Sequence, residues 1–181
     1  MGKTIFIGGL ARSGKSSTLE ILKKLGIPCY STSALLHQTY QKLIEAKLKS
    51  LKRDFEMYDV NNKAELRQEL ITLAEDVLVP TFGREIFAHT VIRRANTDPA
   101  PIVAVETVGG EEFRLGLEVI KKEWICWNIR RDSELKGVDL RELLEGAADI
   151  WNNGSLQDLE KRVVRELDWI KWNQSSKEKE R

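Results

Sequence analysis

The most constraining feature of this chain is an apolar run that leads directly into a glycine-rich segment near the amino terminus. Residues 4–7 are apolar and favour a strand, and residues 17–25 have the apolar period of a helix that stops before Gly26. The segment between them contains the pattern Gly9-x4-Gly14-Lys15-Ser16. A strand, this loop pattern and a helix in that order are typical of a phosphate-binding P-loop. The sequence therefore predicts that the chain binds a nucleoside triphosphate.

The residue types in this loop suit phosphate chemistry. Glycines allow backbone N–H groups to converge on phosphate oxygens, Lys15 adds a positive charge, and Ser16 offers a hydroxyl to Mg²⁺. The following helix directs the positive end of its dipole toward the same point. We expect ATP and Mg²⁺ as cofactors. The residues expected around the triphosphate are Gly9, Ala11, Arg12, Ser13, Gly14, Lys15, Ser16 and Ser17.

Length and charge limit the organisation and the partners. The chain has 181 residues, which suits one α/β domain and is short for two domains with a linker. It carries 29 Lys and Arg against 28 Asp and Glu, so no overall positive field favours a protein that coats nucleic acid. Cys29 and Cys126 lie in apolar runs, which favours buried thiols in a reducing compartment. No stretch approaches the ~20 apolar residues of a membrane span, so we expect a cytoplasmic protein without a membrane partner.

Short apolar runs alternate with helical patterns along the whole chain. The apolar runs are residues 4–7, 27–30, 102–106, 124–129 and 148–151. The helical patterns that follow the first helix are residues 33–52, 62–79, 81–96, 111–122 and 155–172. This alternation predicts a three-layer α/β fold with a five-stranded parallel sheet and helices on both faces.

We expect residues 1–172 to form a single domain with two added features. The helical stretch at about 33–98 interrupts the regular alternation, so it is predicted to be a substrate-binding insertion. Residues at about 130–146 connect the last two strands and are predicted to form a short lid.

The last helical pattern carries two tryptophans and precedes a polar tail. Trp169 and Trp172 fall near one face with apolar residues, and we interpret them as core residues in preference to a base-stacking surface. Residues 173–181 contain no apolar side chain, so they are predicted to be a disordered tail.

Four segments outside the P-loop have counterparts in one known family. They are Tyr30-Ser-Thr-Ser-Ala-Leu-Leu36, Leu66-Arg67 with Phe82-Gly83-Arg84-Glu85, Glu106 with Glu112, and Ala148-Asp-Ile-Trp-Asn-Asn-Gly-Ser-Leu-Gln-Asp-Leu159. With these segments the chain resembles the P-loop nucleoside monophosphate kinases, most closely the bacteriophage-type deoxynucleoside monophosphate kinases and more distantly dephospho-coenzyme A kinases. The resemblance implies a P-loop kinase fold, a phosphotransferase activity and a role in deoxynucleotide metabolism, with a (deoxy)nucleoside monophosphate as the acceptor.

The resemblance also implies an acceptor site. Ser31 lies in the segment that matches the family's monophosphate site, and Glu112 matches its second acidic residue. Arg67 and Arg84 match arginine-bearing segments and are expected to bind the acceptor phosphate, because a guanidinium group pairs well with phosphate oxygens.

A metal site is expected at the end of the third strand. Glu106 stands where the family has an aspartate, and Val108 stands where it has an arginine. A glutamate can hold Mg²⁺ directly or through water, since the ion keeps most of its water ligands. We therefore expect Ser16 and Glu106 at the metal, with Glu106 also beside the substrate.

Polar residues follow the last two strands. Arg130 and Arg131 end the fourth strand, at the edge where open α/β sheets bind ligands. We expect both arginines, together with Lys15, to be catalytic residues that neutralise charge in the transition state. Asn152, Asn153 and Gly154 follow the last strand and are expected to border the adenine of ATP, with an ordinary turn as the alternative.

Other functions stay open on the sequence alone. A P-loop kinase with Glu106 or Glu112 as a base would phosphorylate a hydroxyl, such as a modified base in DNA or a small metabolite alcohol. A binding module that only senses ATP is a third interpretation. A GTPase is disfavoured because Asn62-Lys63-Ala64-Glu65, which is similar to a guanine motif, precedes the switch-like Glu106-Thr-Val-Gly segment and ends in Glu instead of Asp. The sequence leaves open the base, the sugar and whether the chain forms a homodimer.

Overall fold

The computed structural model of the protein describes residues 2–10, 12–50, 67–83, 85–106, 114, 117–132 and 147–179. Its elements occur in the order β1 (Lys3–Gly9), α1 (Lys15–Lys24), β2 (Cys29–Ser31), α2 (Thr32–Ser50), α3 (Arg67–Thr72), η2 (Leu73–Leu78), α4 (Val79–Phe82), α5 (Glu85–Thr97), β3 (Ile102–Glu106), β4 (Glu123–Arg130), β5 (Ala148–Trp151) and α7 (Leu156–Lys179). The five predicted strands are confirmed.

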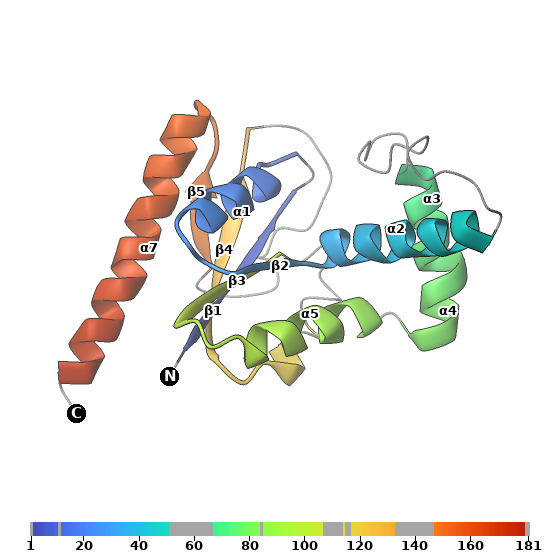
Figure 1. The fold of residues 1–181 in the computed structure, drawn as a ribbon. Coiled ribbons are helices and arrows are strands. Elements are labelled where there is room, and N and C mark those ends of the chain that lie inside the picture. The colour runs from blue at the N-terminus through green and yellow to red at the C-terminus, as the bar shows by residue number, and fades with distance from the viewer. Residues whose placement is uncertain are drawn as a thin grey trace.

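The strands form one sheet in the order β2-β3-β1-β4-β5, and all neighbours are parallel. Helices α1 and α7 cover one face and α5 covers the other, as Figure 1 shows. The predicted three-layer α/β fold is therefore confirmed. Ile7 lies opposite Glu106, and Gly9 lies opposite Ile129, so β1, β3 and β4 end at the same edge. This edge positions the candidate site.

Side chains of β1 alternate between two hydrophobic cores. Ile5 and Ile7 belong to the core under α1 and α7, whereas Phe6 belongs to the core under α5. All three side chains are 0% exposed. Because both faces of the strand are covered, its middle is apolar without interruption over residues 5–7, as is usual for a central parallel strand.

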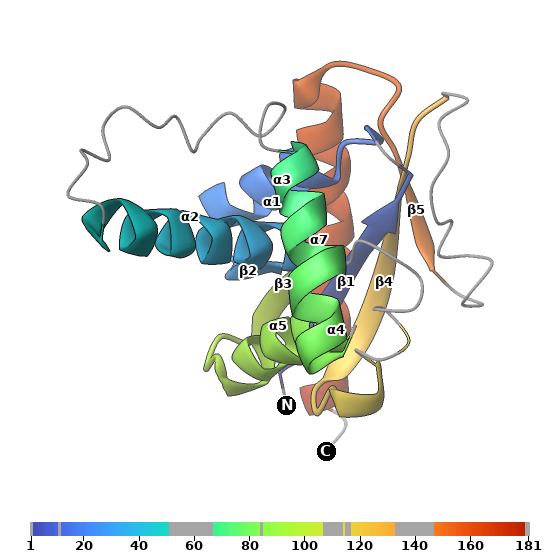
Figure 2. The same cartoon turned by 90° about the vertical axis from the view of Figure 1, so that its right-hand side faces the viewer.

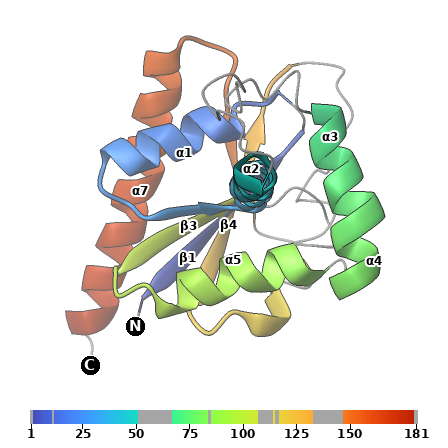
Figure 3. The same ribbon diagram turned by 45° about the vertical axis from the view of Figure 1, so that its right-hand side comes forward.

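Helix α2 projects away from the sheet (Figures 2 and 3), α3 contacts α2, and α4 contacts α5. The sequence predicts separate helices over residues 62–79 and 81–96, whereas the structure places the boundary between them at Gly83. The helical path continues through Pro80 to Phe82 and ends at Gly83, whose φ is 82°. Pro80 has no N–H group to donate, and its ring crowds the preceding turn of a helix. The wide π-helical turn of η2 precedes Pro80 and accommodates it.

The last helix is longer than predicted. Helix α7 continues to Lys179, so the prediction of a disordered tail is corrected over residues 173–179. Extending an existing helix costs far less than nucleating one, and the hydroxyls of Ser175 and Ser176 donate hydrogen bonds to carbonyls one turn earlier. Trp169 and Trp172 are 58% and 66% exposed, so their prediction as core residues is wrong.

Other boundaries differ by a few residues. Strand β2 begins at Cys29 instead of residue 27, because Pro28 has no N–H for a ladder hydrogen bond. Within the predicted helix 111–122, residues 117–119 are helical and residues 120–122 are not. Most of the predicted lid lies outside the described residues. None of the helices in the described ranges combines the length and apolar character needed to cross a membrane.

Candidate active site

The P-loop begins at the carboxyl end of β1, and glycines determine its path. Gly9 has a φ of 137°, and a Cβ atom there would lie 2.2 Å from the carbonyl oxygen of Ile129. Gly14 has a φ of 110°, and a Cβ atom there would lie 2.2 Å from Nδ2 of Asn152. Both positions therefore require glycine for two reasons, the backbone conformation and the close approach of a neighbour. Arg12 is exposed and has a φ of 61°.

Ser13 lies inside this loop. Its side chain is 1% exposed, and its hydroxyl has no hydrogen-bond partner among the described residues. A Cβ atom on Gly9 would lie 2.9 Å from that hydroxyl, so Ser13 points back toward the end of β1. Buried hydroxyls are normally paired, so an orphaned donor in a loop of this shape fits an anionic ligand.

Lys15 is the first residue of α1 and lies over the same loop. Its Nζ donates hydrogen bonds of 2.9 Å to the carbonyl oxygens of Gly9 and Leu10. Burial lowers the pKa of the Lys15 ammonium, and the charge of the Glu106 carboxylate opposes part of that shift. A phosphate would give this partly desolvated cation a second counter-charge. Ser16 and Ser17 follow in the first turn of α1, and Ser16 is exposed.

The neighbouring strands add a hydroxyl and a carboxylate. Ser31 ends β2 and lies opposite Glu106, which ends β3. The Ser31 hydroxyl donates a 2.6 Å hydrogen bond to Oε2 of Glu106 and accepts one of 3.2 Å from the Ala34 N–H in the first turn of α2. Glu106 is 8% exposed. The structure therefore brings together three residues that the sequence predicts at the site: Lys15, Ser31 and Glu106.

On the other side of β1, the end of β4 interacts with β5. The Arg130 guanidinium lies 4.7 Å above the Trp151 ring, and its Nη1 is 3.5 Å from Oδ2 of Asp149. The buried Asn128 side chain donates a 3.0 Å hydrogen bond to Oδ1 of the same carboxylate. The sequence gives no sign of these partners, because they lie on another strand. Arg131 is exposed.

A small pocket adjoins the P-loop at the ends of β4 and β5. Its volume is about 200 Å³. It is lined by Leu10, Asn128, Ile129, Arg130, Arg131, Asp132 and Trp151. Both predicted catalytic arginines thus border a pocket that the P-loop shares through Leu10.

The turn after β5 contacts two predicted functional segments. The Asn152 N–H donates a 2.7 Å hydrogen bond to the carbonyl of Arg130, and its Nδ2 donates one of 2.7 Å to the carbonyl of Ser13 in the P-loop. Asn153 accepts a 2.9 Å hydrogen bond from the Asp132 N–H and donates one of 2.6 Å to the Asp132 carboxylate. The sequence singles out these asparagines through the match of residues 148–159, but it does not reveal either partner.

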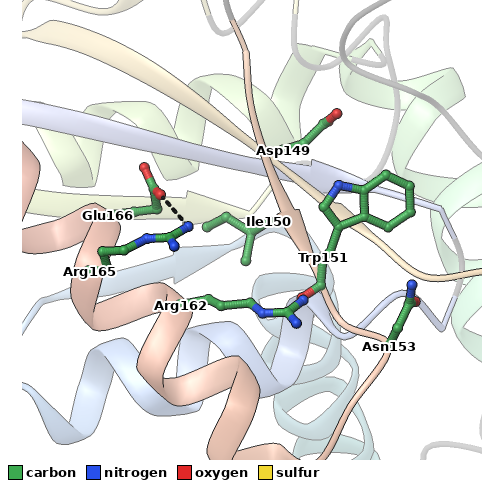
Figure 4. Close-up of a pocket in the computed structure, with 7 residues that line it drawn as sticks. All are labelled: Asp149, Ile150, Trp151, Asn153, Arg162, Arg165 and Glu166. Atoms are coloured by element: carbon green, nitrogen blue, oxygen red, sulfur yellow. Dashed lines mark hydrogen bonds and ion pairs between the residues drawn. The ribbon is translucent and has the colours of Figure 1, made fainter.

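A larger pocket, about 450 Å³, lies between β5 and α7 (Figure 4). It is lined by Asp149, Ile150, Trp151, Asn153, Arg162, Arg165 and Glu166. Arg162 donates a hydrogen bond to the Trp151 carbonyl, and Arg165 lies 3.3 Å from the Glu166 carboxylate. Both arginines are thus engaged within the protein, Arg162 by a backbone carbonyl and Arg165 by the Glu166 carboxylate.

Several predicted site residues are not described. Ala11, Arg84 and Glu112 lie outside the described residues. Arg67 is the first residue of α3, but its side chain is not described. These four residues stay predictions.

Comparison with known proteins identifies the fold. No protein-family model matches the chain, and no curated protein matches it. A gluconokinase from Sinorhizobium meliloti 1021 is 13% identical, with a TM-score of 0.54 over 97% of this chain and 97% of that chain. A dephospho-CoA kinase from Campylobacter jejuni is 16% identical, with a TM-score of 0.52 over 93% and 97% of the two chains. The protein has the fold of these kinases.

Proposed function

We propose that this chain is a phosphotransferase that moves the γ-phosphoryl group of ATP to the phosphate of a nucleoside monophosphate or deoxynucleoside monophosphate. The observation that carries the proposal is the meeting of two groups of residues at one edge of the sheet. One is the P-loop with Lys15, and the other is the Ser31–Glu106 pair next to it. The likeness in fold to two kinases supports phosphoryl transfer in general.

The P-loop side is the donor site of this proposal. Backbone N–H groups of the loop, the buried Ser13 hydroxyl and the Lys15 ammonium would hold the triphosphate of ATP. Ser16 and Glu106 supply the oxygen atoms for Mg²⁺, which needs few protein ligands when phosphates and water complete its shell. The bound ion would neutralise charge on the phosphate oxygens.

The β2–β3 side is the acceptor site. Ser31 precedes the first turn of α2. It lies in the segment that resembles the monophosphate site of the nucleoside monophosphate kinases. Arg67 and Arg84 are proposed to bind the acceptor phosphate from the helical region at 33–98. Phosphoryl transfer needs the two anionic substrates in line and their charge neutralised, so these cations would act with Lys15.

The arginines at the end of β4 complete the proposed machinery. Arg131 is exposed beside the small pocket, whereas Arg130 lies on Trp151 and near Asp149. We propose that Arg131 approaches the phosphates directly and that Arg130 joins it when the lid segment closes. Until then Asp149 and Trp151 hold Arg130 at the edge of the pocket.

A second acceptor chemistry has one observation in its favour. The Glu106 carboxylate is 8% exposed, lies at the centre of the site, and is the type of group that takes a proton from an alcohol. An acceptor phosphate arrives already ionised and needs no such base. The two solved kinases act, by their names, on gluconate and on dephospho-CoA, neither of which is a nucleoside monophosphate, so the likeness in fold does not identify the acceptor of this chain.

A coupled ADP-release assay with ATP and Mg²⁺ tests the proposal. Each ribonucleoside and deoxyribonucleoside monophosphate is offered in turn, with DNA and small alcohols as further acceptors. We expect at least one monophosphate to stimulate ADP release strongly and phosphorus NMR to identify a nucleoside diphosphate. Phosphate attached to a sugar or base hydroxyl would overturn the acceptor assignment. Slow release that ignores every acceptor would instead indicate an ATP-sensing module.

Substitution of a carboxylate separates the two acceptors further. Glu112→Gln should cost at most about tenfold in turnover if the acceptor is a phosphate, since no base is needed. With an alcohol acceptor that uses Glu112 as its base, the same substitution costs ~10²–10⁴-fold. Glu106→Gln is less informative here, because loss of Mg²⁺ would mimic loss of a base.

A further inference from the structure

We propose that Asn152 is a positioning residue for the triphosphate, acting through the P-loop, and that it does not read the adenine base. The side chain is half-buried between two parts of the site. Its Nδ2 donates a 2.7 Å hydrogen bond to the Ser13 carbonyl, and its backbone N–H donates one of 2.7 Å to the Arg130 carbonyl. The residue therefore joins the P-loop to the end of β4.

The hydrogen bond from Asn152 to the Ser13 carbonyl determines the direction of the Gly14 N–H. In a trans peptide the C=O and N–H groups point in opposite directions, and the chain contains no cis peptide bond among the described residues. The Ser13 carbonyl and the Gly14 N–H belong to the same peptide group. Because the carbonyl points toward Asn152, the Gly14 N–H points away from Asn152. Backbone N–H groups at the start of a helix are the groups that bind phosphate. Asn152 thus sets the orientation of one phosphate-binding donor.

Gly14 and Asn152 also fit each other sterically. A Cβ atom on Gly14 would lie 2.2 Å from Nδ2 of Asn152, so the amide rests directly against the glycine. The Gly14 carbonyl accepts hydrogen bonds from the N–H and the hydroxyl of Thr18, at 2.9 and 3.1 Å. The peptide groups on both sides of Gly14 are therefore held from outside the loop, one by Asn152 and the other by Thr18.

Asn152 and its neighbour contact different segments. Asn153 exchanges two hydrogen bonds with Asp132, the last described residue before the lid segment, and among the described residues no hydrogen bond joins it to the loop. The inference rests on the proposed function only in requiring that the P-loop binds the phosphates of ATP. A residue that orients the loop must affect every ligand that carries the phosphates, whether or not a base is attached.

Inorganic tripolyphosphate with Mg²⁺ provides a probe that has phosphates and no base. Its dissociation constant and that of MgATP are measured by titration calorimetry for the wild type and for Asn152→Ala. We expect both constants to rise by the same factor, about tenfold for the loss of a partly buried hydrogen bond that orients the loop. Asn152→Asp keeps the shape but cannot donate and adds a negative charge, so it should weaken both ligands further, even if Asn152→Ala fails to fold.

Ser155→Ala is the matched control, because Ser155 lies in the same turn and caps α7. Its hydroxyl donates a 2.7 Å hydrogen bond to Asp158 and accepts one from the Asp158 N–H. The control should lower Tm and leave tripolyphosphate affinity unchanged. A variant of Asn152 that loses ATP affinity but binds tripolyphosphate as the wild type does would overturn the inference, since that result assigns Asn152 to the base. Equal weakening in Ser155→Ala would also overturn it. A wild-type protein that binds neither ligand would refute the proposed function itself.

Discussion

The two halves of the candidate site are held in different ways. On the donor side, the backbone determines the geometry: Gly9 and Gly14 have positive φ angles and approach neighbouring groups closely. On the acceptor side, side chains determine it: Ser31 donates to Glu106 at 2.6 Å, and Tyr30, one residue earlier, attaches β2 to the segment between α5 and β3 by donating to Asp98 at 2.5 Å. A substitution at either of these glycines must move the backbone, whereas a substitution at Ser31 or Tyr30 removes one contact.

This difference predicts an order of mutational effects. Backbone strain and overpacking each cost one to several kcal/mol, while a single partly exposed hydrogen bond contributes about 1 kcal/mol. We therefore expect donor-side substitutions to affect folding and nucleotide binding most, and acceptor-side substitutions to act more selectively. The predictions below test that order, beginning with the largest effect.

Gly9→Ala should have the largest effect on stability. The new Cβ would lie 2.2 Å from the Ile129 carbonyl oxygen at a φ of 137°, so both strain and overpacking oppose it. We expect a loss of about 2–5 kcal/mol in the free energy of unfolding. Gly26→Ala is the matched control, because Gly26 has a φ of 78° but nothing within 4 Å of the added atom. It should lose only the backbone contribution, about 1–2 kcal/mol. Equal losses in urea unfolding would contradict the role given to the close approach.

Lys15→Ala should remove phosphoryl transfer while leaving the fold intact. The ammonium contacts two loop carbonyls and is partly desolvated, so its loss removes charge from the donor site without opening the core. We expect kcat/KM to fall by about 10²–10³-fold, as for loss of one fixed transition-state donor. Lys24→Ala at the end of α1 is the control and should have wild-type activity. A Lys15→Ala enzyme within threefold of the wild type would refute the assignment.

Glu106→Gln should change the Mg²⁺ requirement more than the stability. Glutamine keeps an oxygen that can accept the Ser31 hydrogen bond but loses the negative charge beside Lys15. We expect the Mg²⁺ concentration for half-maximal rate to rise about tenfold or more. Ser31→Ala keeps the charge and loses the hydrogen bond, so its Mg²⁺ requirement should change much less. If both variants shift the Mg²⁺ titration equally, the carboxylate is held for structure and not for the metal.

Local sequence patterns were sufficient to predict the strands, the P-loop and the layers of this fold. Continuous apolar runs indicate buried parallel strands, and the glycine spacing indicates the loop, because both depend on neighbouring residues. Contacts between distant segments were not predictable in this way. The Ser13–Asn152 hydrogen bond joins residues 139 positions apart. The Arg130–Trp151 contact likewise depends on the pairing of β4 with β5.

Helix geometry accounts for the exposure of the two tryptophans of α7 once the helix is oriented by its buried residues. Trp172 lies nine residues after the buried Val163, about two and a half turns, so it faces the opposite side of the helix and is 66% exposed. Trp169 lies about 100° around the helix from the buried Ile170 and is 58% exposed. The disordered tail was predicted from its polarity alone, although attachment to a packed helix extends the helix to Lys179.

Tyr30→Phe should give the smallest effect, and its dependence on pH identifies the cause. The hydrogen bond from the Tyr30 hydroxyl lowers the pKa of Asp98 below its ordinary 3.8. The pKa of Tyr30 is raised from 10.0 to about 12, mainly by burial and also by its hydrogen bond to Asp98. The pair therefore stabilises the native state when Asp98 is ionised and Tyr30 is protonated. That contribution is lost as the pH falls below the ordinary pKa of the carboxyl, and again as the pH rises from 10.0 toward about 12. We expect the wild type to exceed Tyr30→Phe by about 1 kcal/mol at neutral pH in urea unfolding, with a smaller difference at both extremes. A difference independent of pH would show that the ring environment, and not the hydrogen bond to Asp98, accounts for the loss.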